Sequence, residues 1–84
     1  MEQTEGEVRK VLAEVLSELG VDPDSVADSA TLGSDLELDS TDAVEIGLEL
    51  KRHFSVAVKV QVKGGETLGD LVKLVMGEIR QAGG

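Results

Sequence analysis

The chain of 84 residues contains no cysteine, no tryptophan and no tyrosine. Without cysteine it can form neither disulfides nor thiolate metal sites, which fits a reducing compartment. Phe54 is the only aromatic residue, although hydrophobic residues make up 40% of the sequence. The core must therefore be built from aliphatic side chains, and at this length we expect one small domain spanning residues 1–84.

Lysine and arginine are absent between Asp28 and Glu49, a stretch that carries seven acidic residues. Nucleic acids and anionic membranes require cationic surfaces, so we expect neither as a partner. A protein with a basic surface is the natural complement of this segment. A purely solvating role for the acids would explain the net charge of −9 but not their clustering.

Apolar runs long enough to span a membrane are also missing, and the N-terminus has acidic residues where a secretion signal would have basic ones. We therefore expect a soluble, cytoplasmic and monomeric protein without membrane insertion.

Two helices are predicted from apolar residues at three- and four-residue spacing near the ends of the chain. The first follows a capping-box pair, Thr4 and Glu7, and stops at Gly20. The last begins at the Thr67 and Asp70 pair and runs to about residue 81.

A third helix is predicted between these two, from Asp39 or Ser40 to about residue 54. Acidic residues open it and basic residues close it, which complements the helix dipole. The spacing predicts a buried stripe on one face, formed by Val44, Leu48, Leu50 and Phe54. The outward face should carry three carboxylates, Asp42, Glu45 and Glu49.

Two segments lack helical spacing. Residues 21–39 contain the only proline and repeated Asp, Ser and Gly, so they should form a long ordered loop, pinned to the core by Val26, Leu32, Leu36 and Leu38. In residues 55–66 valine alternates with other residues as in a strand, yet no second strand is available for pairing. We expect an extended connector or a short, distorted helical turn there.

Ser40 is not predicted to be a catalytic nucleophile. The only possible histidine base, His53, lies thirteen residues along the same helix, roughly 20 Å away at ~1.5 Å per residue. The two side chains therefore cannot form the hydrogen bond that activates a nucleophile.

Two other chemical roles are also poorly supported. Counting an EF-hand calcium loop from Asp35 puts Ser40 where glycine is needed and Ile46 where a bidentate glutamate belongs, so no metal site is predicted. The terminal Gly83 and Gly84 suggest a ubiquitin-like modifier or sulfur carrier, but the β-grasp pattern that should precede them is missing. A frayed terminus is the simpler interpretation.

Ser40 is left at the first turn of an acidic helix. A capping role alone would account for many serines at such a position. A helix N-terminus, however, offers free N–H groups and partial positive charge, which would favour a phosphate ester on this hydroxyl.

These residues resemble the acyl carrier proteins. The sequence from Asp35 to Ser40, DLELDS, is similar to the family pattern D-L-G-x-D-S, and the likeness extends from Val8 to Ile79. Further matching positions are Asp42, Val44, Glu45, Leu48, Leu50 and Phe54, with Leu19-Gly20-Val21 and Ala30-Thr31-Leu32 upstream.

The resemblance implies an all-α fold, a small four-helix bundle whose third helix is short or distorted, and a carrier rather than an enzyme. Ser40 would hold a 4′-phosphopantetheine arm, attached by a phosphopantetheinyl transferase and carrying acyl groups as thioesters in a fatty-acid, polyketide or specialised lipid pathway. Basic patches on the transferase and on acyl-processing enzymes would read four acidic residues, Asp39, Asp42, Glu45 and Glu49.

Some positions depart from the family pattern. Thr41 stands where leucine or methionine usually follows the serine, Glu37 replaces a glycine, and Gly47 replaces a branched residue. We hypothesise that Gly47 leaves space for a bulky or unusual acyl chain. Two alternatives stay open: a carrier of aminoacyl groups, and a degenerate carrier fold that serves only as a protein-interaction module.

Overall fold

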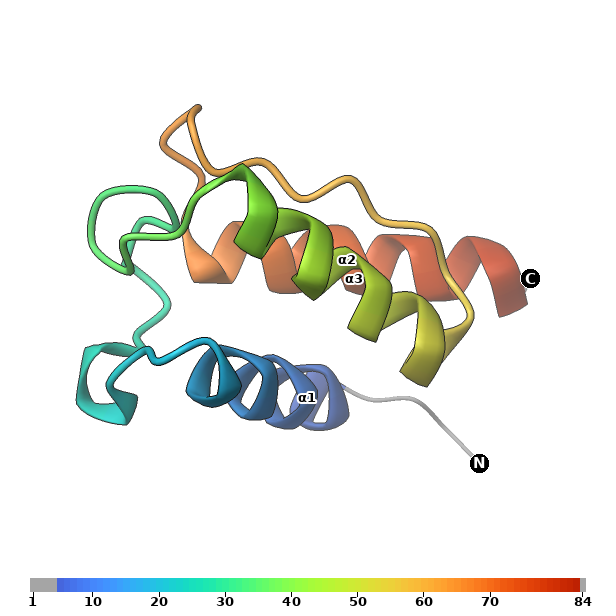
Figure 1. The fold of residues 1–84 in the computed structure, drawn as a ribbon. Coiled ribbons are helices and arrows are strands. Elements are labelled where there is room, and N and C mark those ends of the chain that lie inside the picture. Colours follow the sequence, from blue (N-terminus) through green and yellow to red (C-terminus); the bar gives the residue numbers. More distant parts are fainter. Residues whose placement is uncertain (1–4, 84) are drawn as a thin grey trace.

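The computed structural model describes residues 5–83, except for the side chains of residues 82 and 83. Its helices are α1 (Glu5–Glu18), the 3₁₀ turn η1 (Pro23–Ser25), α2 (Ser40–Phe54) and α3 (Leu68–Gly83). Figure 1 shows that α2 and α3 run in the same direction, and that α1 runs the opposite way and packs against both. Within the described residues, the regular secondary structure elements are all helices.

α1 and α2 end where the sequence predicts, whereas α3 runs to Gly83, two residues beyond its predicted end. Gly20 has a φ of 91° and stops α1, and the N–H of the next residue, Val21, donates to the carbonyl of Leu16 at 2.9 Å. Thr67 and Asp70 form the predicted reciprocal cap of α3, with N···O distances of 3.1 and 3.2 Å. Hydrogen bonds from Thr67 hold the pKa of Asp70 below its usual value. The predicted cap of α1 involves Thr4, which lies outside the described residues.

The core is aliphatic apart from Phe54. Each helix contributes one inward stripe: Val8, Val11, Leu12, Val15 and Leu16 from α1, Ala43, Ile46, Leu50 and Phe54 from α2, and Leu68, Leu71, Val72 and Val75 from α3. The long loop before α2 adds Leu32, Leu36 and Leu38, as predicted, and Val26 packs partly against them.

The predicted inward face of α2 is wrong in one respect. Val44 and Leu48 are 61% and 52% exposed, whereas Leu50 and Phe54 are buried as expected. Apolar residues occupy two neighbouring faces of this helix, and packing on α1 selects the face that contains Ile46. Helical spacing alone could not show which face would meet the core.

Residues 21–39 form an ordered loop that is tied to the start of α3. The N–H of Leu32 donates to the carbonyl of Glu66, and the N–H of Leu68 donates to that of Ala30, both at 2.9 Å. The same loop is joined to α1, where Arg9 pairs with Asp28 and lowers its pKa. The residues just before Ser40 are therefore fixed in position.

Residues 55–67 form the connector between α2 and α3, and residues 56–61 of it are extended, which is one of the two expected conformations. The expected third helix of a four-helix bundle is not confirmed. Val56 and Val62 are buried, Val58 and Val60 are half-buried, and the residues between them are exposed. The alternating valines thus have the period of a strand, but within residues 5–83 no strand pairs with them. Because α2 and α3 are parallel, the connector must run back along the whole length of α2. This length is about 22 Å for fifteen residues at 1.5 Å each, and extended backbone covers that distance.

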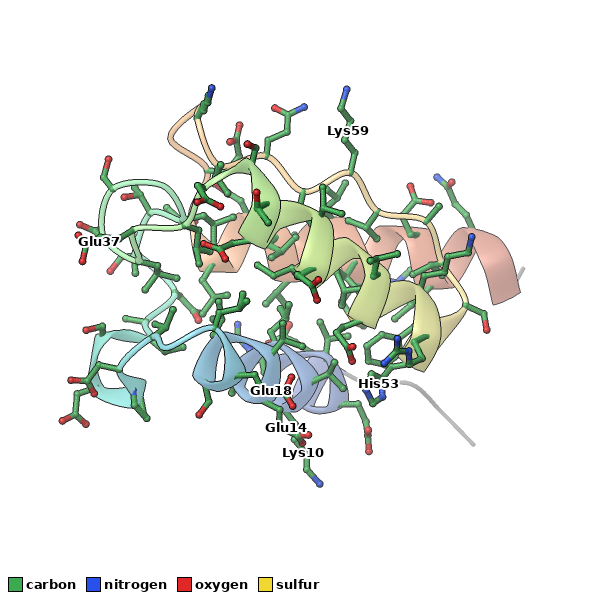
Figure 2. The ribbon with its side chains drawn as sticks, in the orientation of Figure 1. Lys10, Glu14, Glu18, Glu37, His53 and Lys59 are labelled. Carbon is green, nitrogen blue, oxygen red and sulfur yellow. The ribbon has the colours of Figure 1, made fainter. Side chains whose placement is uncertain are left out.

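Glu37 has a φ of 55°, in the left-handed region, at the position where the family pattern has glycine. Its side chain is exposed and labelled in Figure 2. A residue with a Cβ costs roughly 1–2 kcal/mol in this conformation, so the loop before Ser40 holds local strain.

We predict that Glu37→Gly increases the free energy of unfolding by about 1 kcal/mol, because glycine adopts positive φ without that cost. Chemical denaturation of the two proteins measures the difference. Glu37→Ala, which removes the carboxylate but keeps the Cβ, is the control and should not stabilise. Equal stability of the Gly and Ala variants would contradict a backbone origin.

Candidate functional site

Ser40 is the first residue of α2 and its side chain is exposed. No residue in the described part of the chain hydrogen-bonds to its hydroxyl. The backbone N–H groups of Ser40 and Thr41 likewise find no acceptor among residues 5–83, as expected for the first turn of a helix. The site therefore combines a free hydroxyl with unused hydrogen-bond donors at the positive end of a helix dipole.

A reciprocal capping box fixes this end of α2. The N–H of Asp42 donates to Asp39 Oδ1 at 2.9 Å, and the N–H of Asp39 donates to Asp42 Oδ2 at 3.2 Å. Both carboxylates flank Ser40 and accept backbone hydrogen bonds. They therefore hold the serine in the first turn, whatever further role their charges have.

The two other acids of the predicted docking set differ in their surroundings. Glu45 is exposed on the outer surface of α2. Glu49 is only 19% exposed in its side chain and pairs with Arg52 at 2.9 Å, while His53 Nε2 lies 3.6 Å from its second oxygen. His53 is thus placed at the far end of α2 from Ser40, and the two side chains do not meet, as predicted.

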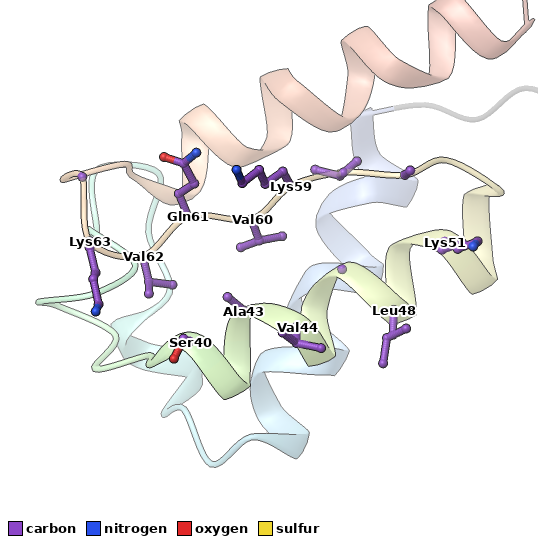
Figure 3. A pocket seen from close by; sticks show the side chains of 14 residues that line it. Ser40, Ala43, Val44, Leu48, Lys51, Lys59, Val60, Gln61, Val62 and Lys63 are labelled. Atoms are coloured by element: carbon purple, nitrogen blue, oxygen red, sulfur yellow. The ribbon is translucent and has the colours of Figure 1, made fainter.

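An open groove of about 820 Å³ begins at Ser40 and runs along α2 (Figure 3). One wall comes from α2, with Ala43, Val44, Gly47, Leu48 and Lys51, and the other comes from residues 57–64 of the connector. A Cβ added at Gly47 would lie 3.4 Å from the carbonyl oxygen of Val58 across the groove. Glycine at this position therefore widens the groove.

Val44 and Leu48 are the site residues that sequence reasoning missed. They follow Ser40 at intervals of four residues and so share its face of the helix. Their exposure is explained by the groove, which both of them line. The sequence signal that could have identified them is their four-residue spacing from Ser40, which places them on its face of the helix and not on the face of the buried residues.

Comparison with known proteins identifies the family. A family model described as "Phosphopantetheine attachment site" matches residues 9–75. The chain belongs to this family. An acyl carrier protein of Thermosynechococcus vestitus (strain NIES-2133 / IAM M-273 / BP-1) is 40% identical over 51 residues, which cover 61% of this chain and 63% of that protein. The matched part thus spans less than two thirds of the relative's length. No solved structure matches the chain.

Membership of the phosphopantetheine-attachment family implies a covalent 4′-phosphopantetheine, and the residues at the start of α2 suit its phosphate. The free N–H groups at this turn can donate to phosphate oxygens. The hydroxyl stands clear of the core, and the groove beside it could receive an attached chain. No helix in the described part of the protein is long and apolar enough to cross a membrane.

The capping box yields a test of what Asp39 does. Asp39→Ala removes the N-cap acceptor and should lower the free energy of unfolding by about 1 kcal/mol. Asp39→Asn keeps a side-chain oxygen for the N–H of Asp42 and should stay near the wild type. Denaturant titration of both variants checks this. Equal loss in the Asn and Ala variants would show that the charge, not the cap, stabilises α2.

Proposed function

We propose that this protein is an acyl carrier protein, not itself an enzyme, and that Ser40 carries its 4′-phosphopantetheine arm. The observation that supports this most strongly is the exposed, unbonded hydroxyl of Ser40 in the first turn of α2, inside the matched family region. The arm supplies a terminal thiol, which holds acyl groups as thioesters.

Attachment requires one phosphoryl transfer from coenzyme A. The Oγ of Ser40 forms the new bond to the phosphorus that bears pantetheine, and the bond from that phosphorus to the bridging oxygen breaks. Adenosine 3′,5′-bisphosphate leaves with that oxygen, and the serine proton passes to a base on the transferase. His53 cannot act as that base, because it lies at the other end of α2, where its Nε2 is 3.6 Å from a carboxylate oxygen of Glu49.

The groove beside Ser40 would shelter the acyl chain. Its walls expose Val44 and Leu48 from α2 and the half-buried Val58 and Val60 from the connector. An acyl chain lying between them would remove apolar surface of both walls from water. The bulky-chain hypothesis for Gly47 and the complete four-helix bundle both stay predictions.

The partners we propose are a phosphopantetheinyl transferase and acyl-processing enzymes with basic docking patches. Four acidic residues surround or follow Ser40 on α2: Asp39, Asp42, Glu45 and Glu49. Asp39 and Glu45 are exposed, whereas the charge of Glu49 is already paired with Arg52. Docking should therefore depend more on Asp39 and Glu45 than on Glu49.

We predict that Glu45→Gln slows modification by a transferase at low salt by roughly 1.4- to fivefold, because exposed ion pairs are worth ~0.2–1 kcal/mol each. Glu14→Gln, which removes an exposed charge from α1, is the matched control. The difference should fade at high ionic strength. Equal slowing by both substitutions would indicate an effect of net charge rather than docking.

The attachment site is tested by coexpression with a broad-specificity transferase, followed by intact mass measurement. The wild type should gain one phosphopantetheine and Ser40→Ala should gain none. Ser29→Ala, in the loop before α2, should be modified like the wild type. Addition to Ser40→Ala would place the arm elsewhere. No addition to any of these proteins would favour the degenerate interaction module.

A further inference from the structure

The connector has the side-chain pattern of a β-strand but lacks the hydrogen bonds of one. Residues 56–61 are extended, and buried or half-buried valines alternate in them with exposed side chains. Among residues 5–83, no hydrogen bond reaches a backbone N–H or C=O group of residues 56–61. An extended segment whose backbone groups are unpaired is the kind of edge to which a strand of another chain adds.

The two edges of this segment have different surroundings, because successive residues of an extended chain turn their N–H and C=O groups toward opposite edges. A Cβ at Gly47 would lie 3.4 Å from the carbonyl oxygen of Val58, so this oxygen faces α2. The carbonyl oxygen of Val62 likewise lies against Gly33, in the loop before α2, and leaves no room there for a Cβ. The valine edge is therefore covered. The open edge consists of the backbone groups of the residues between the valines, Ala57, Lys59 and Gln61.

The open edge has room beside it. Figure 3 shows the connector running between α2 and α3, so the edge turned away from α2 faces α3. A second cavity, of about 200 Å³, lies there and is lined by Lys59 and Gln61 from the connector and by Leu71 and Leu74 from α3. Leu74 is 45% exposed although it is apolar. A strand added at this edge would cover Leu74 and remove its surface from water.

The charges around the open edge favour an acidic partner. Lys59 points away from α2 into solvent (Figure 2), and within residues 5–83 neither it nor the exposed Lys63 forms an ion pair. Two acidic residues also border this region, but both carboxylates are engaged. Asp70 caps α3, and the carboxylate of Glu66 lies against Gly64 with its Oε2 buried. The lysines are therefore the charges that an incoming segment would meet.

We infer that the open edge of residues 57–61 binds an extended, acidic segment of a partner protein by strand addition. The backbone of that segment bonds to the unpaired N–H and C=O groups of the connector. Its carboxylates pair with Lys59 across the two strands, and its apolar side chains cover Leu74. A second copy of this chain is a poor occupant, because both copies carry a net charge of −9. The inference does not depend on modification of Ser40.

The test uses three short synthetic peptides and the full chain. One peptide alternates valine with glutamate, and the second alternates valine with lysine. The third is the acidic peptide N-methylated at two consecutive central residues, so that neither of its edges can pair. Fluorescence anisotropy of labelled peptides gives the dissociation constants, and amide chemical shifts of the protein locate the binding site. The acidic peptide should bind and shift the amides of residues 57–61, whereas its N-methylated form should not bind.

Two pairs of variants separate the backbone contribution from the charge contribution. Gln61→Pro removes one backbone donor and should weaken binding of the acidic peptide by roughly two- to twelvefold, whereas Gln61→Ala keeps the donor and should bind like the wild type. Lys59→Glu should reverse the preference from the acidic to the basic peptide. Lys10→Glu, which makes the same change of charge on α1, should not. Chemical denaturation establishes that each variant is folded.

Three results would overturn the inference. The first is an absence of binding by the acidic peptide. The second is equal binding of its N-methylated form, which would show that the backbone edge is not used. The third is a set of amide shifts that leaves residues 57–61 unaffected. The N-methylated peptide tests the backbone edge on the unaltered protein, so this result is independent of how the proline variant folds.

Discussion

The arrangement of this protein depends on how the start of α2 is held. Asp39 and Asp42 cap each other's backbone, and the preceding loop is bonded to the start of α3 through Leu32 and to α1 through Asp28. These contacts fix a short turn whose serine faces solvent. Because the cap satisfies the N–H of Asp42 but not those of Ser40 and Thr41, the turn keeps donors free for a phosphate.

Much of this could be predicted from the sequence, because it depends on local rules. Helix bounds follow from caps and stops such as Thr67, Asp70 and Gly20, and the burial of Leu32, Leu36 and Leu38 follows from their spacing in a polar loop. The position of Ser40 in the first turn depends on the same signals. The family resemblance, read from DLELDS and its flanking residues, agrees with the match to residues 9–75.

The features that were not predicted depend on packing between distant segments. Val44 and Leu48 have helical spacing equal to that of a core stripe, and only the position of α1 shows that they border a groove instead. The connector's conformation depends on the parallel course of α2 and α3. The groove itself appears only when residues 57–64 lie across from α2, since its two walls come from separate segments of the chain.

A small aliphatic core, a fixed serine and an adjoining groove are the features on which the proposed carrier function depends. We propose Ser40 as the point of attachment. Peptide mapping by mass spectrometry of the transferase-treated wild type tests it most directly, because it locates the added group on one residue. We expect phosphopantetheine on the peptide containing Ser40, with fragments that assign it to this serine. Assignment to another residue, or an unmodified peptide after exhaustive treatment, would contradict it.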